Sequence, residues 1–307
     1  MTEGAVLEWL LDGDPAVAWQ AQRGLLDVEE ATWSATRRRV STEGWGRQLL
    51  DLQDTNGRWA RGLYQPKWTS TNYTLLELRR FGLDPANQAA KKGVQVLLDD
   101  AVWVDGGVSY WAGQDLAERC VNGMVLSLAS YFEVDDDRVD GMAKGLIDAR
   151  LRDGAWNCRD YLGDNRHSSF HTTISILEAL VLWGRWRATG AADEVLASAH
   201  EFMFSHHLFR SHTTGDVINE AWTRFSFPPR WHYDILRGLD HLRDADVRDA
   251  RMSEAMELVR ERRRADGRWS IGPAYSGERH FRMETGRQGG RWNTLRALRV
   301  LDWWDAP

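Results

Sequence analysis

Apolar residues along this chain recur with the spacing of an α-helix. In five segments they fall at every third or fourth position, which places them on one face of a helix. These segments are residues 6–11, 17–26, 75–81, 174–181 and 235–242. Almost no stretch alternates apolar and polar residues, as a half-buried strand would. The pattern predicts an all-α protein.

Short turns that combine glycine with tryptophan separate these segments and recur at a regular interval. The turn glycines are Gly57, Gly107, Gly154 and Gly267. The first intervals between these glycines are near fifty residues, and the last is about twice as long. The last interval fits the same period if it holds two units, with a degenerate repeat around residues 219–229. Such a period is typical of a helical repeat array. Each repeat reads as a helix, a Gly-Trp turn and a second helix. The sequence therefore predicts about six helical hairpins in a single domain, 1–307.

The second helices can be aligned by their apolar runs, and polar residues then fall at equivalent positions. These positions hold Ser70, Cys120, His171, Arg230 and Gly289; two residues further on Asn72, Asn122, Thr173, His232 and Arg291; and four residues further on Thr74, Met124, Ser175, Asp234 and Asn293. If the hairpins close into a ring, the starts of the inner helices converge on one end of a central cavity. The first hairpin, 1–40, looks like a HEAT-type helix pair and is expected to close the ring on the last helix.

The Gly-x-Trp turns, the period and the tripeptide Phe170-His171-Thr172 resemble the α/α-toroid superfamily of squalene and hopene cyclases and protein prenyltransferase β-subunits. The resemblance covers roughly residues 57–304. It implies an α/α toroid, and a terpene cyclase- or prenyltransferase-like protein with an aromatic central cavity. The specific reaction stays open, because one fold hosts unrelated chemistries.

The resemblance also implies a zinc cofactor. Protein prenyltransferases hold zinc with an Asp-x-Cys at the start of one inner helix and a His, in a Phe-His-Thr setting, one repeat later. At those places this chain has Glu118, Cys120 and His171. A carboxylate, a thiolate and an imidazole leave the fourth tetrahedral position open, as a catalytic zinc site needs. If no metal is bound, Cys120 is a small buried apolar residue and His171 a helix cap. If a metal is bound, Cys158 is a candidate substitute ligand, provided that its loop folds inward.

Two features of the superfamily are missing from the sequence. The Asp-x-Asp-Asp acid with which cyclases protonate an alkene does not occur, and the loop 108–116 lacks the basic residues that grip a diphosphate in prenyltransferases. Other arginines that would have to replace them are Arg159, Arg166, Arg230 and Arg291. A diphosphate needs several charge-assisted hydrogen bonds. We therefore expect a neutral or weakly polar hydrophobe to bind in preference to a free prenyl diphosphate.

Acidic residues give two further candidates. Asp136-Asp137-x-x-Asp140 fits the magnesium motif of class I diphosphate chemistry, but a single copy at a helix start favours a capping role. Glu284 is either an acid at the cavity mouth or an ion-pair partner of Arg287.

His232 and Asp234 are the predicted general acid–base pair. Two alternatives stay open: His232 completes a metal site, or it is a buried histidine that bonds to the start of its own helix. The remaining polar and aromatic residues at the mouth are the predicted substrate contacts. They are Trp68, Asn72, Asn122, Thr173, Arg230, Trp231, Arg291, Trp292 and Asn293.

Composition narrows the class of protein. The chain has a formal net charge of −6 and 17 tryptophans, which either plate a helical shell or line an aromatic cavity. The acidic balance argues against a nucleic-acid-binding surface. Two cysteines cannot form a disulfide framework. No apolar run is long enough to span a membrane, and the acidic residues near the start are unlike a signal peptide, so we expect a cytoplasmic protein.

Three function classes are compatible with these features. The first is an enzyme with a zinc or acid–base centre that acts on an apolar, isoprenoid-like small molecule. The second is a noncatalytic toroid that binds a ligand or a partner protein not identified by the sequence. The third, a glycan-processing α/α barrel, requires two carboxylates at the mouth, of which the alignment supplies only Asp234.

Overall fold

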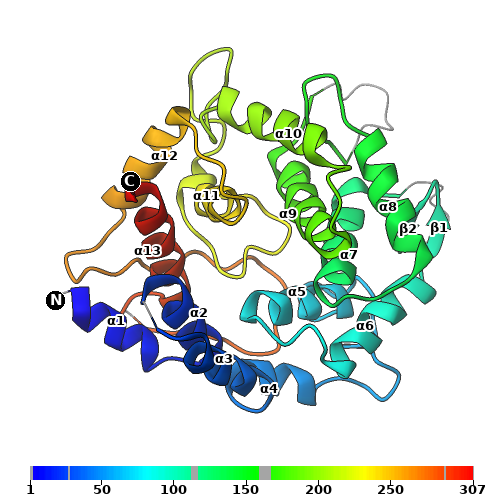
Figure 1. Ribbon diagram of the computed structural model, residues 1–307, viewed down its shortest axis with the longest axis horizontal. Helices are drawn as coiled ribbons and strands as arrows, with labels where there is room; N and C mark the ends of the chain where they lie inside the picture. Colours follow the sequence, from blue (N-terminus) through cyan, green and yellow to red (C-terminus); the bar gives the residue numbers. More distant parts are fainter. Residues whose placement is uncertain (1–2, 27, 112–116, 159–166, 287, 307) are drawn as a thin grey trace.

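Helices are the main regular secondary structure of the chain (Figure 1). The structure is a computed structural model that describes residues 3–26, 28–111, 117–158, 167–286 and 288–306. In chain order the described α-helices are α1 (Glu3–Leu11), α2 (Pro15–Leu25), α3 (Glu30–Arg38), α4 (Gly44–Asp51), α5 (Thr71–Phe81), α6 (Gln88–Asp99), α7 (Arg119–Tyr131), α8 (Asp137–Asp148), α9 (Phe170–Arg187), α10 (Asp193–Ser205), α11 (Ile235–Asp244), α12 (Ser253–Glu261) and α13 (Arg291–Asp305). Short 3-10 turns are η1 (Arg39–Ser41), η3 (Glu220–Thr223) and η4 (Ala250–Met252). The all-α prediction is confirmed.

Short polar side chains fix where several helices begin. The Asp14 carboxylate accepts the N–H of Ala16 at 2.9 Å, ahead of Pro15 at the first position of α2. Asp136 caps α8 in the same way, and this supports the capping interpretation of the Asp-Asp-x-x-Asp sequence. Each cap satisfies a backbone donor that has no partner within its helix.

Three of the predicted Gly-Trp turns have the same construction. The indole N–H groups of Trp59, Trp156 and Trp269 donate to backbone carbonyls ten residues earlier, at 2.7, 2.7 and 2.8 Å. The turn glycines Gly57, Gly154 and Gly267 have φ values of 91°, 100° and 79°. Side chains other than glycine rarely adopt this backbone region. Each turn therefore ties a buried indole to the helix that precedes it.

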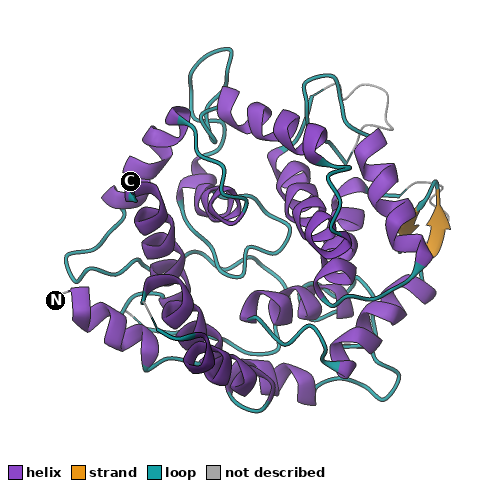
Figure 2. Cartoon of the chain, viewed as in Figure 1, coloured by secondary structure: helices purple, strands orange, loops and turns teal. Residues whose placement is uncertain are grey.

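The fourth predicted turn forms a β-hairpin (Figure 2). Strand β1 (Val102–Val104) pairs antiparallel with β2 (Gly107–Ser109). Asp105 and Gly106 join them with φ values of 48° and 76°, the left-handed pair that a tight hairpin turn requires. Strands of three residues are too short to show an alternating pattern, and for this reason they were not predicted.

Six of the described helices pack on one another in a closed circuit. α5 packs on α7, α7 on α9, α9 on α11, α11 on α13, and α13 on α2. Trp19 and Gln20 of α2 then donate to the carbonyls of Phe81 and Arg80 at the end of α5, at 2.8 and 3.0 Å. These helices surround the middle of the molecule in Figure 1, and α6, α8 and α10 lie outside them.

No helix in the described ranges has the length and apolar composition needed to cross a membrane.

Candidate functional site: an arginine-lined central cavity

Two of the predicted substrate contacts hold turns in place. The Thr173 hydroxyl accepts the Trp156 N–H at 3.3 Å, and the Asn122 amide bonds both the N–H and the carbonyl of Val108. Thr71 and Thr294 bind Trp59 and Trp269 in the same manner. Polar residues such as these recur at helix starts because they bind the backbone of the preceding turn.

The register of the last helix differs from the predicted one. The Thr294 hydroxyl accepts the Trp269 N–H, as the Thr173 hydroxyl accepts the Trp156 N–H. The sequence alignment had instead matched Thr173 with Arg291. Arg291 instead donates to the Trp9 carbonyl at 3.0 Å and lies against the Trp9 ring. Asn293 donates to the carbonyls of Phe225 and Ser270. These two side chains thus bind neighbouring parts of the fold.

The predicted zinc ligands make the following contacts. The Glu118 backbone carbonyl accepts from Asn122, and the Cys120 backbone N–H donates to the Cys158 sulfur at 2.9 Å. The His171 Nδ1 accepts the Tyr233 N–H at 2.8 Å. Among the described residues, no three His, Cys, Asp or Glu side chains form a group that could hold a metal ion. The zinc cofactor stays a prediction.

His232 lies in an aromatic stack, with its ring 3.8 Å from that of Trp231 and 3.7 Å from that of Tyr275. Burial, with the nearby His171 and Arg237, lowers the pKa of His232 to about 3, so the ring is neutral at physiological pH. No hydrogen bond joins His232 to Asp234 in the structure described. Asp234 caps α11 by accepting the N–H of Arg237 at 2.8 Å. Acid–base chemistry by this pair has no support in these contacts.

A cavity of about 420 Å³ lies near this stack, beneath residues 271–286. Trp68, Arg230 and Glu284 contribute to its lining. Arg230 forms a buried ion pair with Glu77, and burial lowers the pKa of Arg230 to about 9. Glu284 accepts the Arg291 N–H, and burial raises the pKa of Glu284 to about 7.

Most of the predicted substrate contacts are buried, and Asn72 and Trp292 are two examples. Arg159, Arg166 and Arg287 lie outside the described residues. Asn72 is fully buried, with its amide nitrogen 3.8 Å from the sulfur of Met124. Trp292 is also buried, and its ring stacks on that of Phe227 at 4.1 Å.

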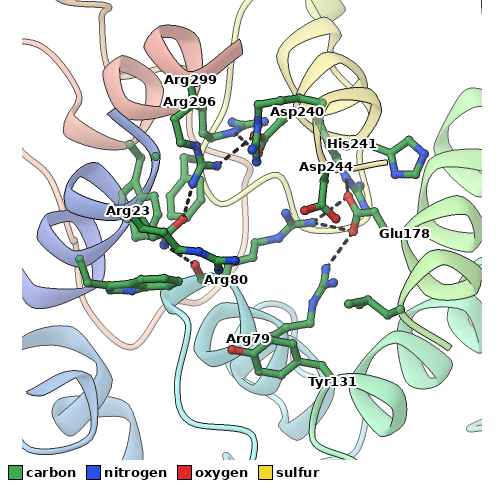
Figure 3. A pocket seen from close by; sticks show the side chains of 18 residues that line it. Arg23, Arg79, Arg80, Tyr131, Glu178, Asp240, His241, Asp244, Arg296 and Arg299 are labelled. Carbon is green, nitrogen blue, oxygen red and sulfur yellow. Dashed lines mark hydrogen bonds and ion pairs between the residues drawn. The ribbon is translucent and has the colours of Figure 1, made fainter. Parts of the chain in front are cut away.

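A second cavity, of about 370 Å³, lies inside the circuit of helices (Figure 3). Trp292 is the one predicted site residue that lines it. Seven of the described lining residues are arginines and three carry carboxylates. They are Arg23, Arg79, Arg80, Arg237, Arg243, Arg296 and Arg299, with Glu178, Asp240 and Asp244.

Two of these carboxylates are each surrounded by arginines. Glu178 lies 2.7 Å from Arg237, 2.8 Å from Arg79 and 3.1 Å from Arg80. Although burial alone opposes ionisation of Glu178, these three guanidinium groups hold its pKa well below the ordinary value.

Asp240 forms the second cluster. It lies 3.0 Å from Arg299, 3.2 Å from Arg243 and 3.6 Å from Arg296. Figure 3 shows Arg296 and Arg299 beside Asp240, and Arg79 directed at Glu178. The arginines likewise hold the pKa of Asp240 below its ordinary value against the effect of burial, so both carboxylates are ionised.

Three guanidinium nitrogens at this cavity lack a hydrogen-bond partner within the described part of the chain. They are Nε of Arg79, Nη2 of Arg296 and Nε of Arg299, and all three are buried. Burial also lowers the pKa of Arg80 to about 9 and that of Arg299 below its ordinary value. Buried cations without full compensation are costly. The lining therefore has more positive charge and more donors than its own acids can satisfy.

These arginines were not predicted from the sequence, because arginine on a helix is usually a surface residue. One signal was present. Glu178 and Arg296 each interrupt an apolar run, in Ile174–Leu180 and Leu295–Val300 respectively. A charge on the apolar face of a predicted inner helix points to a partner across the cavity.

Comparisons with known proteins provide information about the fold of the chain but not about its function. No protein-family model and no curated protein matches the chain. It is similar to a crystal structure of a protein from Actinoplanes, with a TM-score of 0.50 and 17% sequence identity. The alignment covers 94% of this chain and 89% of that chain.

Proposed function

We propose that the helices form an α/α toroid whose central cavity binds an anionic ligand that also carries an apolar or aromatic part. The observation that carries the proposal is the group of arginines around Glu178 and Asp240, which has buried N–H donors without acceptors. An anion in the cavity supplies these acceptors and offsets the repulsion between the guanidinium groups. Phosphate, diphosphate and carboxylate groups have the required geometry, because arginine binds them through paired donors.

The apolar part of the ligand is inferred from the rest of the lining. Trp19, Leu182, Phe227 and Trp292 contribute apolar surface to the same cavity. Ligand pockets commonly combine such surface with a few polar groups that fix orientation. An amphiphilic anion therefore fits better than a small inorganic ion alone.

The proposal favours binding over acid–base catalysis. Arginines keep both Glu178 and Asp240 ionised, so neither carboxylate is suited to donate a proton near neutral pH. Burial lowers the pKa of His241 at the cavity wall to about 4. The terpene cyclase- or prenyltransferase-like enzyme stays a prediction, and prenyl diphosphates are one class of the proposed ligand. The neutral hydrophobe expected from the sequence follows from the missing basic residues in the loop 108–116, and none of the arginines named there as replacements is among the described lining of this cavity. The two hypotheses therefore make opposite predictions.

Calorimetric titration distinguishes an anionic ligand from a neutral hydrophobe. A prenyl diphosphate, the matching prenyl alcohol and inorganic diphosphate are each titrated into the unmutated protein and into the variants Arg79→Gln and Arg299→Gln. Each lost charge-assisted hydrogen bond contributes about 1.5–3 kcal/mol, so each variant should bind the prenyl diphosphate about 10- to 100-fold more weakly. Arg47→Gln, which removes an exposed arginine paired with Asp51, is the matched control and should bind normally.

Stability measurements distinguish a ligand-binding role from a structural one. If these arginines serve the ligand, Arg79→Gln should unfold no more easily than the unmutated protein without ligand, because Arg80 and Arg237 still pair with Glu178 and the repulsion among the three guanidinium groups is relieved. Tighter binding of the alcohol than of the diphosphate would overturn the proposal. Equal diphosphate binding by all variants would do the same.

A further inference from the structure

The only two cysteines of the chain contact each other. Cys120 is the second residue of α7, and Cys158 follows the Gly154–Trp156 turn. The Cys120 N–H donates to the Cys158 sulfur at 2.9 Å. Both cysteines are half-buried and reduced. Two residues 38 positions apart are thus held together by the fold without a covalent bond.

The surroundings make the two sulfurs unequal. The Cys158 sulfur accepts the backbone N–H of Cys120, the second residue of α7. It therefore lies at the first turn of α7, where the free N–H groups and the helix dipole favour negative charge on a sulfur. Cys120 is the thiol in contact with it and is placed to close a disulfide.

We propose that Cys158 and Cys120 form a redox-active dithiol, in which Cys158 reacts with a hydroperoxide and Cys120 then closes a disulfide. The Cys158 thiolate attacks one peroxide oxygen and the O–O bond breaks. The other oxygen leaves with a proton as an alcohol, or as water from hydrogen peroxide, and Cys158 becomes a sulfenic acid.

The second step uses the neighbouring thiol. Cys120 loses its proton and attacks the Cys158 sulfur, and the hydroxyl group leaves as water with that proton. Two thiols and one hydroperoxide thus give one disulfide, one alcohol and one water, so two electrons pass from the sulfurs to the peroxide. The product joins the start of α7 to the segment that leads from the Gly154–Trp156 turn towards α9.

The test uses the full chain, in which thiol counts are unambiguous because it has two cysteines. The native protein is treated with hydrogen peroxide near neutral pH, and thiols are counted with Ellman's reagent. We expect both thiols to disappear together, a mass loss of about 2 Da, and a disulfide within a single chain. Cys120→Ser should stop at the sulfenic acid of Cys158, trapped by dimedone. Cys158→Ser should react at least about tenfold more slowly.

A measurement on the unmutated protein guards against variants that fail to fold. Brief alkylation with iodoacetamide at neutral pH, followed by peptide mass spectrometry, should label Cys158 before Cys120, and denaturant should abolish this preference. Faster labelling of Cys120 would overturn the proposal. Disulfides formed only between chains, or peroxide reaction no faster in the native than in the denatured protein, would also overturn it.

Discussion

Individual buried polar residues in this protein are paired across helices, and one pair has a consequence for acid stability. His200 of α10 and His241 of α11 are nearly fully buried, and their Nε2 atoms lie 3.0 Å apart. One ring must donate to the other, so the bond requires at least one neutral imidazole. Burial lowers the pKa of His200 to about 3 and that of His241 to about 4.

These two histidines should destabilise the fold as the pH falls below about 6.5, the ordinary pKa of histidine in an unfolded chain. Between about pH 6.5 and 4 the two histidines bind protons in the unfolded chain but stay neutral in the folded protein. The free energy of unfolding therefore decreases as the pH falls. Each such proton contributes up to about 1.4 kcal/mol per pH unit. His200→Gln should therefore show a smaller slope of unfolding free energy against pH, measured by urea unfolding from pH 4.5 to 7.5. His167→Gln, at an exposed position, should leave the slope unchanged. An unchanged slope in His200→Gln would mean that the pair takes up protons while folded.

Among the elements, the repeated unit is a turn fastened to both of its helices. The buried indole bonds to the preceding helix, and a hydroxyl at the start of the next helix accepts the tryptophan backbone N–H. Thr173→Val keeps the shape of the side chain but leaves that N–H buried and unsatisfied. We expect a loss of about 1–3 kcal/mol in the free energy of unfolding, measured by denaturant titration. Thr173→Ser retains the hydroxyl and should retain most of the stability. A Thr173→Val variant with normal stability but altered ligand binding would instead support the predicted substrate contact.

The sequence predicted the helices and turns well because these depend on local patterns. Gly57, Gly154 and Gly267 identify backbone that must turn with positive φ, whatever the tertiary context. The register of the last repeat was not predictable in this way, since Trp269 and Thr294 are separated by 25 residues whereas Trp156 and Thr173 are separated by 17.

The charged lining of the central cavity could not be predicted for a different reason. Its clusters join residues from four helices, such as Arg79 with Glu178, which lie 99 positions apart. Arg296 interrupts an apolar run, but the sequence does not show which residue is its partner, and an arginine such as Arg79 is indistinguishable from one on a helix surface. Only the packing of the helices brings the charges together.

For the whole molecule, the decisive feature is that the N-terminal helices complete the circuit. α2 packs on α13, and its Trp19 and Gln20 bond to the end of α5, so α2 has inner neighbours on two sides. Arg291 at the start of α13 also bonds to the Trp9 carbonyl of α1. In an open repeat array, by contrast, a terminal helix pair has a neighbour on one side and separates more easily.

Hydrogen exchange measures whether closure makes the molecule one cooperative unit. Amides of residues 17–21 in α2 should exchange only when the whole protein unfolds, and therefore with the same opening free energy as residues 174–180 in α9. Gln20→Ala removes the bond to the Arg80 carbonyl and the acceptor for Arg299, and should accelerate exchange in α2 before it affects α9. An anion bound in the central cavity should slow exchange in α2 and α13 together, because both helices line it. If α2 exchanges far earlier than α9 in the unmutated protein, the N-terminal helices are an appendage to the other repeats. The cavity then loses the wall formed by Trp19 and Gln20 whenever α2 separates from α5 and α13.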